Sequence, residues 1–320
     1  MKRQHKTALA LALLLMLTAC GSPMKKAEPM EVGPIGILRG TTGLGLVPLM
    51  AEGEQETQAE YRFHLADSAQ ELGQALRNGE VNLACLPVDL AVDWMKETPD
   101  RWEILAVSDL GQLCIVENGN AVQSVRDLEG TTLTACGRGT AAETALRYLL
   151  AEHGLDPYHA VTINWKEDPG ECLAALASGA VTLALLPQPA ATVAQSKVQD
   201  LRLALDLTEE WAAMGQKLVG SVLVARKDWA KAHPREVEVF LEEAGAAVDW
   251  VKEHPSQAAE QIAWQGLLKG AAVAERTLPR CHLVWLTGAE KKAHLAAYLD
   301  AAGDVELEQE ALTSPEKAGT

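Results

Sequence analysis

The stretch ALRNGEVNLACLP, residues 75–87, returns one hundred residues later as ALASGAVTLALLP, residues 175–187. Each copy contains a helical end, a glycine suited to a left-handed backbone, an apolar strand and a terminating proline. The glycines and prolines match as well as the aliphatic residues do, and the period is too long for a solenoid. The repeat therefore predicts two similar α/β lobes.

Pro87 and Pro187 mark the carboxyl ends of the two predicted strands. Ligands of open α/β sheets bind in the crevice beyond such ends, so the repeat also predicts a cleft between the lobes. The alternation of strands and helices places 32–113 and 222–302 in one lobe and 114–221 in the other. We expect two strands, near 112–116 and 221–225, to join the lobes as a hinge.

The amino terminus has the layout of a secretory signal. Lys2, Arg3 and Lys6 precede an apolar run of about eleven residues, too short for a spanning helix of roughly 20 residues. The run ends in Leu-Thr-Ala followed by Cys20. We therefore expect a signal peptide over 1–19, with an ordinary cleaved signal as the alternative to lipidation of Cys20. Residues 20–31 are expected to form a flexible tether and 303–320 a flexible tail.

Composition limits the class of protein. The 320 residues are 48% hydrophobic and 22% charged, as in a folded protein, and the formal net charge is −16. Removal of residues 1–19 takes away three cations and no acids, which leaves −19. Such a charge opposes nucleic-acid binding, so no nucleic-acid partner is expected. Outside 1–19 the sequence offers no apolar stretch long enough to span a bilayer.

Five cysteines follow Cys20, an odd number with no C-x-x-C pair: Cys85, Cys114, Cys136, Cys172 and Cys281. Buried free thiols are the favoured interpretation, and disulfides in an oxidising compartment stay open.

Five stretches follow one another along the chain: LTAC, GILRGTTGLGLVPLM, LRNGEVNLACLP, VRDLEGTTLTACGRGTAAETALRYLLAEHGLDP and LASGAVTLALLPQPAAT. In these stretches the chain resembles the substrate-binding lipoproteins of ABC transporters, in the type II periplasmic-binding-protein branch with nitrate, sulfonate, taurine and thiamine-pyrimidine binders. The resemblance runs from about Val32 to Leu286. It implies two α/β lobes on a two-strand hinge. It also implies a lipid-anchored, extracytoplasmic receptor that delivers a small molecule to a membrane permease.

In this family four loops at strand ends line the cleft. The matching residues here are Arg39, Gly40, Thr41, Thr42, Gly43, Pro87, Val88, Asp89, Gly137, Arg138, Gly139, Thr140, Pro187, Gln188 and Pro189. Helices begin just after these loops, so their N–H groups favour anionic ligand groups. Arg39 and Arg138 would add one cation per lobe as an anion clamp; the alternative is solvation or pairing with surface acids.

Asp89 and Gln188 are expected at corresponding positions of the two repeats. They would accept hydrogen bonds from ligand amino groups, or cap helices. Trp165 and Trp211 would stack on a flat ligand or be buried in the core.

The sequence gives little sign of chemistry. Gly137-x-Gly139-x-x-Ala142 matches a dinucleotide fingerprint only weakly, and the eight histidines form no metal-binding spacing. We expect no cofactor, no metal and no catalytic residue.

The predicted function is therefore capture of a small ligand, sulfonate-like, nitrate-like or pyrimidine-like, by a monomer anchored through Cys20. The alternatives are an enzyme of pyrimidine-type metabolism on the same fold, or a receptor subunit that senses its ligand.

Overall fold

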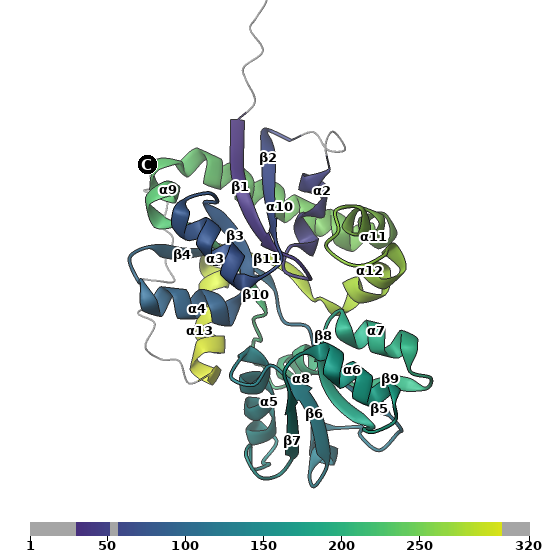
Figure 1. The fold of residues 1–320 in the computed structure, drawn as a ribbon. Coiled ribbons are helices and arrows are strands. Elements are labelled where there is room, and N and C mark those ends of the chain that lie inside the picture. Colours follow the sequence, from purple (N-terminus) through teal and green to yellow (C-terminus); the bar gives the residue numbers. More distant parts are fainter. Residues whose placement is uncertain (1–29, 52–56, 303–320) are drawn as a thin grey trace, which may run out of the picture. The chain divides into compact units, whose positions relative to one another are not determined.

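The computed structural model describes residues 30–51 and 57–302 (Figure 1). The predicted signal peptide, Cys20, almost all of the tether and the tail lie outside these residues. No helix within the described ranges is long and apolar enough to cross a membrane.

The first lobe is built on a six-stranded sheet in the order β11-β4-β10-β3-β1-β2. Its strands are β1 (Met30–Leu38), β2 (Ala59–Ala66), β3 (Leu83–Pro87), β4 (Trp102–Asp109), β10 (Ser221–Arg226) and β11 (Leu283–Leu286). Its helices are η1 (Leu44–Leu46), α2 (Val47–Met50), α3 (Ala69–Asn78), α4 (Val88–Glu97), α9 (Lys227–Ala232), α10 (Pro234–Glu253), α11 (Pro255–Trp264), α12 (Ala271–Thr277), η3 (Leu278–Arg280) and α13 (Gly288–Ala302).

The second lobe is built on a five-stranded sheet in the order β7-β6-β8-β5-β9. Its strands are β5 (Leu113–Asn118), β6 (Thr132–Cys136), β7 (Thr162–Lys166), β8 (Leu183–Pro187) and β9 (Leu201–Asp206). Its helices are η2 (Val125–Leu128), α5 (Ala141–Glu152), α6 (Pro169–Ala177), α7 (Ala190–Lys197) and α8 (Leu207–Ala213). The two sheets confirm the predicted fold class, whereas the lobe limits given above stay a prediction.

The sequence repeat is also a repeat of backbone geometry. Gly79 and Gly179 both adopt the left-handed conformation, with φ of 75° and 71°. In each copy the N–H of the next residue donates to the carbonyl oxygen of Ala75 or Ala175, at 2.9 and 3.0 Å. These bonds satisfy carbonyls at the helix end and turn the chain into β3 or β8. The predicted helix-turn-strand unit is therefore confirmed in both lobes.

The chain passes between the lobes twice, through 110–112 and through 214–220. Each crossing feeds a strand that pairs antiparallel with a repeat strand: β10 with β3, and β5 with β8. The register is the same in both lobes, since Pro87 lies opposite Ser221 and Pro187 lies opposite Leu113. The carboxyl ends of both repeat strands therefore lie beside the crossings.

The last described helix, α13, contacts both lobes. Lys291 near its start is fully buried and donates to the carbonyl oxygen of Ile104 in β4 at 2.5 Å. Near its other end the ring of Tyr298 lies 6.2 Å from that of Trp211 in α8. Ile104, Trp211 and Tyr298 belong to one core cluster of buried apolar side chains, which joins the lobes in addition to the crossings.

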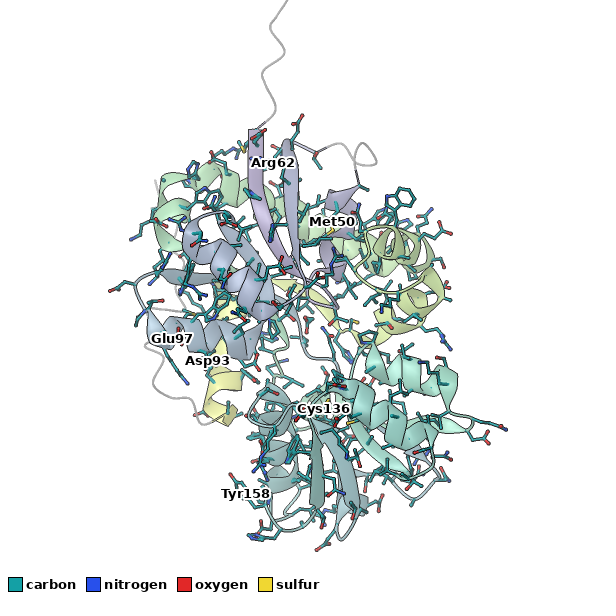
Figure 2. The ribbon with its side chains drawn as sticks, in the orientation of Figure 1. Met50, Arg62, Asp93, Glu97, Cys136 and Tyr158 are labelled. Carbon is teal, nitrogen blue, oxygen red and sulfur yellow. The ribbon has the colours of Figure 1, made fainter. Side chains whose placement is uncertain are left out.

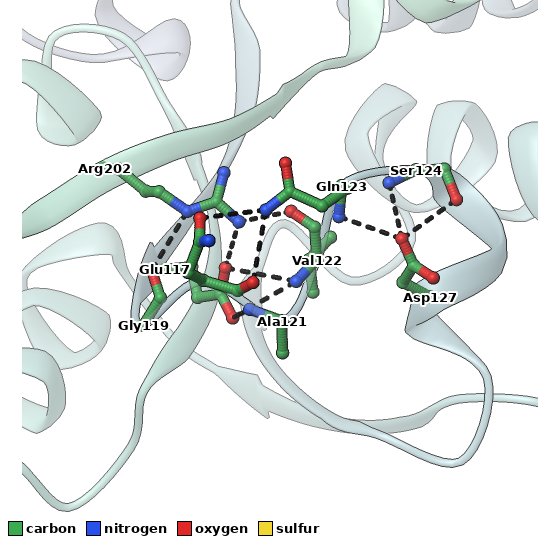
Figure 3. Close-up of polar contacts among 9 residues, drawn as sticks. Glu117, Gly119, Ala121, Val122, Gln123, Ser124, Asp127 and Arg202 are labelled. Carbon is green, nitrogen blue, oxygen red and sulfur yellow. Dashed lines mark hydrogen bonds and ion pairs between the residues drawn. The ribbon is translucent and has the colours of Figure 1, made fainter.

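Within the second lobe, a buried carboxylate organises the end of β5 that lies away from the crossing (Figure 3). Glu117 accepts from the N–H of Ala121 at 2.8 Å and forms an ion pair with Arg202 of β9. Arg202 also donates to the carbonyl oxygen of Gly119 at 3.0 Å. This network fixes the turn after β5 and the pairing of β5 with β9.

Candidate functional site

The strand ends of both lobes line a cavity of about 410 Å³ beside the two crossings. We call it the crossing cavity. The first lobe contributes loops after β1 and β3, and the second contributes loops after β6 and β8. Figure 2 labels Cys136, the last residue of β6, which belongs to this lining. The volume of the crossing cavity is typical of a small-molecule site.

The structure brings together eight of the fifteen residues predicted to bind ligand. The residues that line the crossing cavity are Thr41, Thr42, Pro87, Asp89, Gly137, Thr140, Pro187 and Gln188. The remaining seven are not part of this lining: Arg39, Gly40, Gly43, Val88, Arg138, Gly139 and Pro189. Ligand binding by any of them stays a prediction.

Neither predicted clamp arginine reaches the crossing cavity. Arg39 Nε lies 2.7 Å from Asp67 Oδ1, and its Nη1 donates to the carbonyl oxygen of Gly266 at 2.9 Å. Pairing with a surface acid, the alternative left open above, is what the structure shows for Arg39. Arg138 is exposed. Against the effect of burial, the Gly139 N–H and Arg147 lower the pKa of Glu143, and the charge of Arg138 adds to them.

Asp89 connects the two lobes across the crossing cavity. Its Oδ1 accepts from the N–H of Leu90 at 2.8 Å, within its own helix α4. Its Oδ2 accepts from the N–H of Ala141 at 3.2 Å, at the first residue of α5 in the other lobe. A carboxylate at a helix N-terminus is stabilised by the free N–H groups and by the helix dipole. Asp89 therefore favours the observed approach of the lobes.

Gln188 has a different role, and the expectation that it corresponds to Asp89 is wrong. The offset of one hundred pairs Gln188 with Val88, and Asp89 with Pro189. The main-chain roles of Gln188 and Val88 do match, since Val88 N–H donates to Gly220 O and Gln188 N–H donates to Gln112 O, both at 2.9 Å. These two bonds tie each repeat strand to one crossing.

The side chain of Gln188 is used within its own lobe. It is 4% exposed, and its Oε1 accepts from Thr192 Oγ1 at 2.7 Å and from Thr192 N–H at 3.3 Å. Its Nε2 lies 3.6 Å from Cys114 Sγ. Capping of α7, the second possibility given for this residue, is therefore the observed contact.

Sequence reasoning missed the residues that the crossings contribute. Asp109 ends β4, Gln112 precedes β5, Gly220 precedes β10 and Ser221 begins β10. All four line the cavity. The signal in the sequence was an acid, Asp109, two residues after the apolar run Ile104–Val107. A Cβ on Gly220 would lie 1.9 Å from Asp109 Oδ1 and 2.8 Å from Gly111 N, so only glycine fits where the crossings meet.

Asp109 is the most deeply buried acid of the lining, with 1% of its surface exposed. Its Oδ1 accepts from Gly111 N–H at 3.1 Å, whereas its Oδ2 has no hydrogen-bond partner among the described residues. Burial raises the pKa of Asp109 to about 6, although nearby Ser221 and Gln112 side chains favour the charged form. Such a perturbed carboxyl in a cavity is typical of a functional site.

Other hollows are less suited to a ligand shared by two lobes. One of about 350 Å³ adjoins the crossing cavity, shares Asp89 and Ala141 with it, and extends to α13. A larger one of about 830 Å³ is lined by α2, α10 and α11 alone, with the 89% exposed Trp264 at its edge. Of these three hollows in the described part of the chain, the crossing cavity combines a buried acid with walls from both lobes.

The remaining predicted groups lie outside the crossing cavity. Trp211 is fully buried and donates to the carbonyl oxygen of Ala145 at 3.2 Å, and Trp165 is half-buried in β7. The five cysteines after Cys20 are all buried and free. Within the described residues, histidine, cysteine, aspartate and glutamate form no group of three suited to a metal.

Comparisons with known proteins agree with this geometry. Residues 105–258 match the protein-family model described as NMT1/THI5 like. No curated protein matches the sequence.

Several solved structures share the fold. An ABC transporter from Parabacteroides distasonis is 18% identical, with 90% of this chain and 96% of that chain covered and a TM-score of 0.72. The periplasmic aliphatic sulphonate binding protein SsuA from Escherichia coli is 17% identical, with 91% and 94% covered and a TM-score of 0.71. The alkanesulfonate-binding protein SsuA from Xanthomonas axonopodis pv. citri is 20% identical, with 90% and 99% covered and a TM-score of 0.62. The chain thus has the two-lobe fold of periplasmic binding proteins.

Proposed function

We propose that this chain, an NMT1/THI5-like segment within a two-lobe binding-protein fold, is the solute-binding component of an ABC importer. The observation that carries the proposal is the crossing cavity, whose walls come from the strand ends of both lobes. The fold by itself would not name a function, because one fold serves many. The chain would capture a small molecule outside the cytoplasm and present it to a membrane permease.

Ligand binding at this place would act on the relative position of the lobes. Both crossings are short, and each is hydrogen-bonded to the end of a repeat strand. A ligand that contacts both lobes binds the closed arrangement better, and only this difference in affinity shifts the population toward it. The crossing cavity is where such a ligand touches both lobes beside the segments that bend.

Thermal unfolding with and without ligand tests the proposal. A binding protein should be stabilised by about 2.7 kcal/mol at a hundredfold excess of ligand over Kd, because ligand binds only the folded state. Small-angle scattering should show a smaller radius of gyration at saturation. Conversion of the ligand into a product by the purified chain would contradict the proposal and favour an enzyme on this fold.

We also propose that the chain is held at the membrane by lipid on Cys20. The support is the order of basic residues, apolar run and Leu-Thr-Ala-Cys in the sequence. With acyl chains on its first residue, the protein would be stably anchored, because two chains suffice where one is marginal. Cys20→Ala should release the protein from the membrane fraction and abolish incorporation of labelled palmitate. Persistent labelling of the variant would reject this anchor.

A further inference from the structure

We propose that the ligand presents a positively charged nitrogen group, an ammonium, amidinium or protonated amino-heterocycle, to Asp109 in the crossing cavity. This inference rests on the proposed function, since it names the chemical class of the molecule that the site would take. It differs from an anionic ligand, which the loops and arginines of the sequence favour and which the sulphonate-binding neighbours take.

The charges on the cavity wall are the first observation. Asp89, Asp109 and Glu167 line the crossing cavity, and none of its lining residues is a lysine, arginine or histidine. The charge of His282 favours the ionised form of Asp109, but His282 Nε2 lies 3.0 Å from Asp206 Oδ2 and is used there. Three carboxylates without a lining cation raise the local concentration of positive ligands and repel anions.

The helix N-termini around the cavity are the second observation. A free helix N-terminus would attract an anion, but the protein's own acceptors already use these N–H groups. At α5, Glu143 accepts from Gly139 N–H at 2.8 Å, and Asp89 accepts from Ala141 N–H. At α6, Asp168 accepts from Gly170 N–H at 2.6 Å. An anionic ligand would have to displace a carboxylate that is held in place.

The same holds for the helices that follow the repeat strands. Asp89 accepts from the N–H of Leu90 in α4, and Gln188 accepts from that of Thr192 in α7. Four of the helices that begin at the cavity, α4, α5, α6 and α7, therefore have a side-chain acceptor from the protein at their first turn, whereas η1, after the loop of Thr41 and Thr42, has no side-chain cap. Among its lining residues the wall offers carboxylates to a ligand but no cationic side chain.

Asp109 is the third observation, and it is independent of the other acids. It is 1% exposed, its Oδ1 is bound to Gly111 N–H, and its Oδ2 is buried without a partner among the described residues. An ionised carboxylate accepts about four hydrogen bonds, and a buried one without enough donors is costly. A cationic N–H donor in the cavity would satisfy Oδ2 and compensate the charge.

The experiment uses the full chain and a bacterial small-molecule extract, separated by ion exchange into cation-retained, anion-retained and unretained fractions. Each fraction is titrated into the protein while the melting temperature is followed. The cation-retained fraction should raise the melting temperature. Asp109→Asn, which keeps the shape and removes the charge, should increase the amount needed for half of the maximal shift by about tenfold or more.

The matched control is Asp249→Asn on α10, which removes an equal charge from an exposed pair with Lys252 and should leave the titration unchanged. If Asp109→Asn fails to fold, Asp89→Asn gives the same test at a half-buried position. The inference would be overturned if the anion-retained or the unretained fraction stabilised the protein and this stabilisation was unchanged in Asp109→Asn or lost in Arg138→Ala. The proposed binding function would then remain. Absence of stabilisation by every fraction would overturn both.

Discussion

The two lobes differ in how they satisfy the polar side chains at their strand ends. In the second lobe Gln188 is bound by Thr192, and Asp206 accepts from the N–H of Thr208 at 3.0 Å and pairs with His282. In the first lobe Asp109, which ends β4 as Asp206 ends β9, keeps Oδ2 without a partner among the described residues. The repeated scaffold is the same in both lobes, and the difference suggests that the first lobe supplies the groups that recognise the ligand.

The largest expected effect concerns Asp109 and Asp206, whose replacement by asparagine should change the free energy of unfolding in opposite directions. The folded pKa of Asp109, about 6, lies above its ordinary value of 3.8, so its ionised form destabilises the ligand-free protein. The stabilisation due to its neutral form is complete below about pH 4 and is lost as the pH rises through 6. A shift of this size corresponds to about 3 kcal/mol. Asp109→Asn should therefore raise the free energy of unfolding at pH 7 by up to about 3 kcal/mol.

Asp206→Asn should act in the opposite direction. It removes the charged partner of His282. Burial lowers the pKa of His282, but Asp206, together with Glu209 and Asp109, raises it above its ordinary value. The free energy of unfolding should fall by about 1–3 kcal/mol. The fall should be larger below pH 6.5 than above the raised pKa of His282, since the ion pair stabilises His282 most when it is cationic. Urea unfolding of both variants from pH 4 to 8 measures these changes. Changes in the free energy of unfolding that have the same sign for both variants at pH 7 would contradict the proposed difference between the lobes.

The next comparison concerns the residues just after the repeat prolines. Gln188→Ala should destabilise the protein by about 1–3 kcal/mol, because it removes a buried acceptor of Thr192. Asp89→Ala removes one bond within α4 and one across the lobes, at a half-buried site, and should cost less. Its larger effect should be on the distribution of lobe positions, seen as a change in scattering of the ligand-free protein. A larger loss of stability in Asp89→Ala than in Gln188→Ala would contradict the view that Gln188 stabilises the fold and Asp89 mainly sets the position of the lobes.

The smallest effect compares the two glycines of the repeat. Gly179→Ala should cost about 1–2 kcal/mol, because alanine disfavours a left-handed backbone and nothing described lies within 4 Å of its Cβ. Gly79→Ala should cost more, since its Cβ would lie 2.4 Å from Arg226 Nη1 and displace that ion-paired side chain. Chemical denaturation of both variants measures the difference. A lower cost at Gly79 would show that Arg226 moves away without loss.

The fold was predictable to a large extent because each copy of the repeat contains the residues that end its helix and its strand. Gly79 with Pro87, and Gly179 with Pro187, bound each strand through backbone restrictions that act locally, so no knowledge of distant contacts was needed. Short elements such as α9 and α12 escaped prediction, since a few residues give little periodicity and packing decides their conformation.

The site was predictable only in its loops. Thr41, Asp89 and Gly137 follow strands, and that position alone brings them to the cavity. The charge of the wall was not predictable, because it depends on where side chains pair. Arg39 is near a strand end in the sequence, yet it bonds to Asp67 and Gly266, two residues whose proximity only the folded chain reveals.

The reactivity of the Cys136 thiol reports how accessible the crossing cavity is. It lines the cavity and is 5% exposed, and a hydrogen bond with Cys172 lowers its pKa. Burial instead raises the pKa of Cys85 and of Cys114 to about 12. The rate of alkylation at Cys136 should therefore follow the opening of the lobes in the native protein, and an occupied cavity should slow it in proportion to the fraction of molecules that hold a ligand.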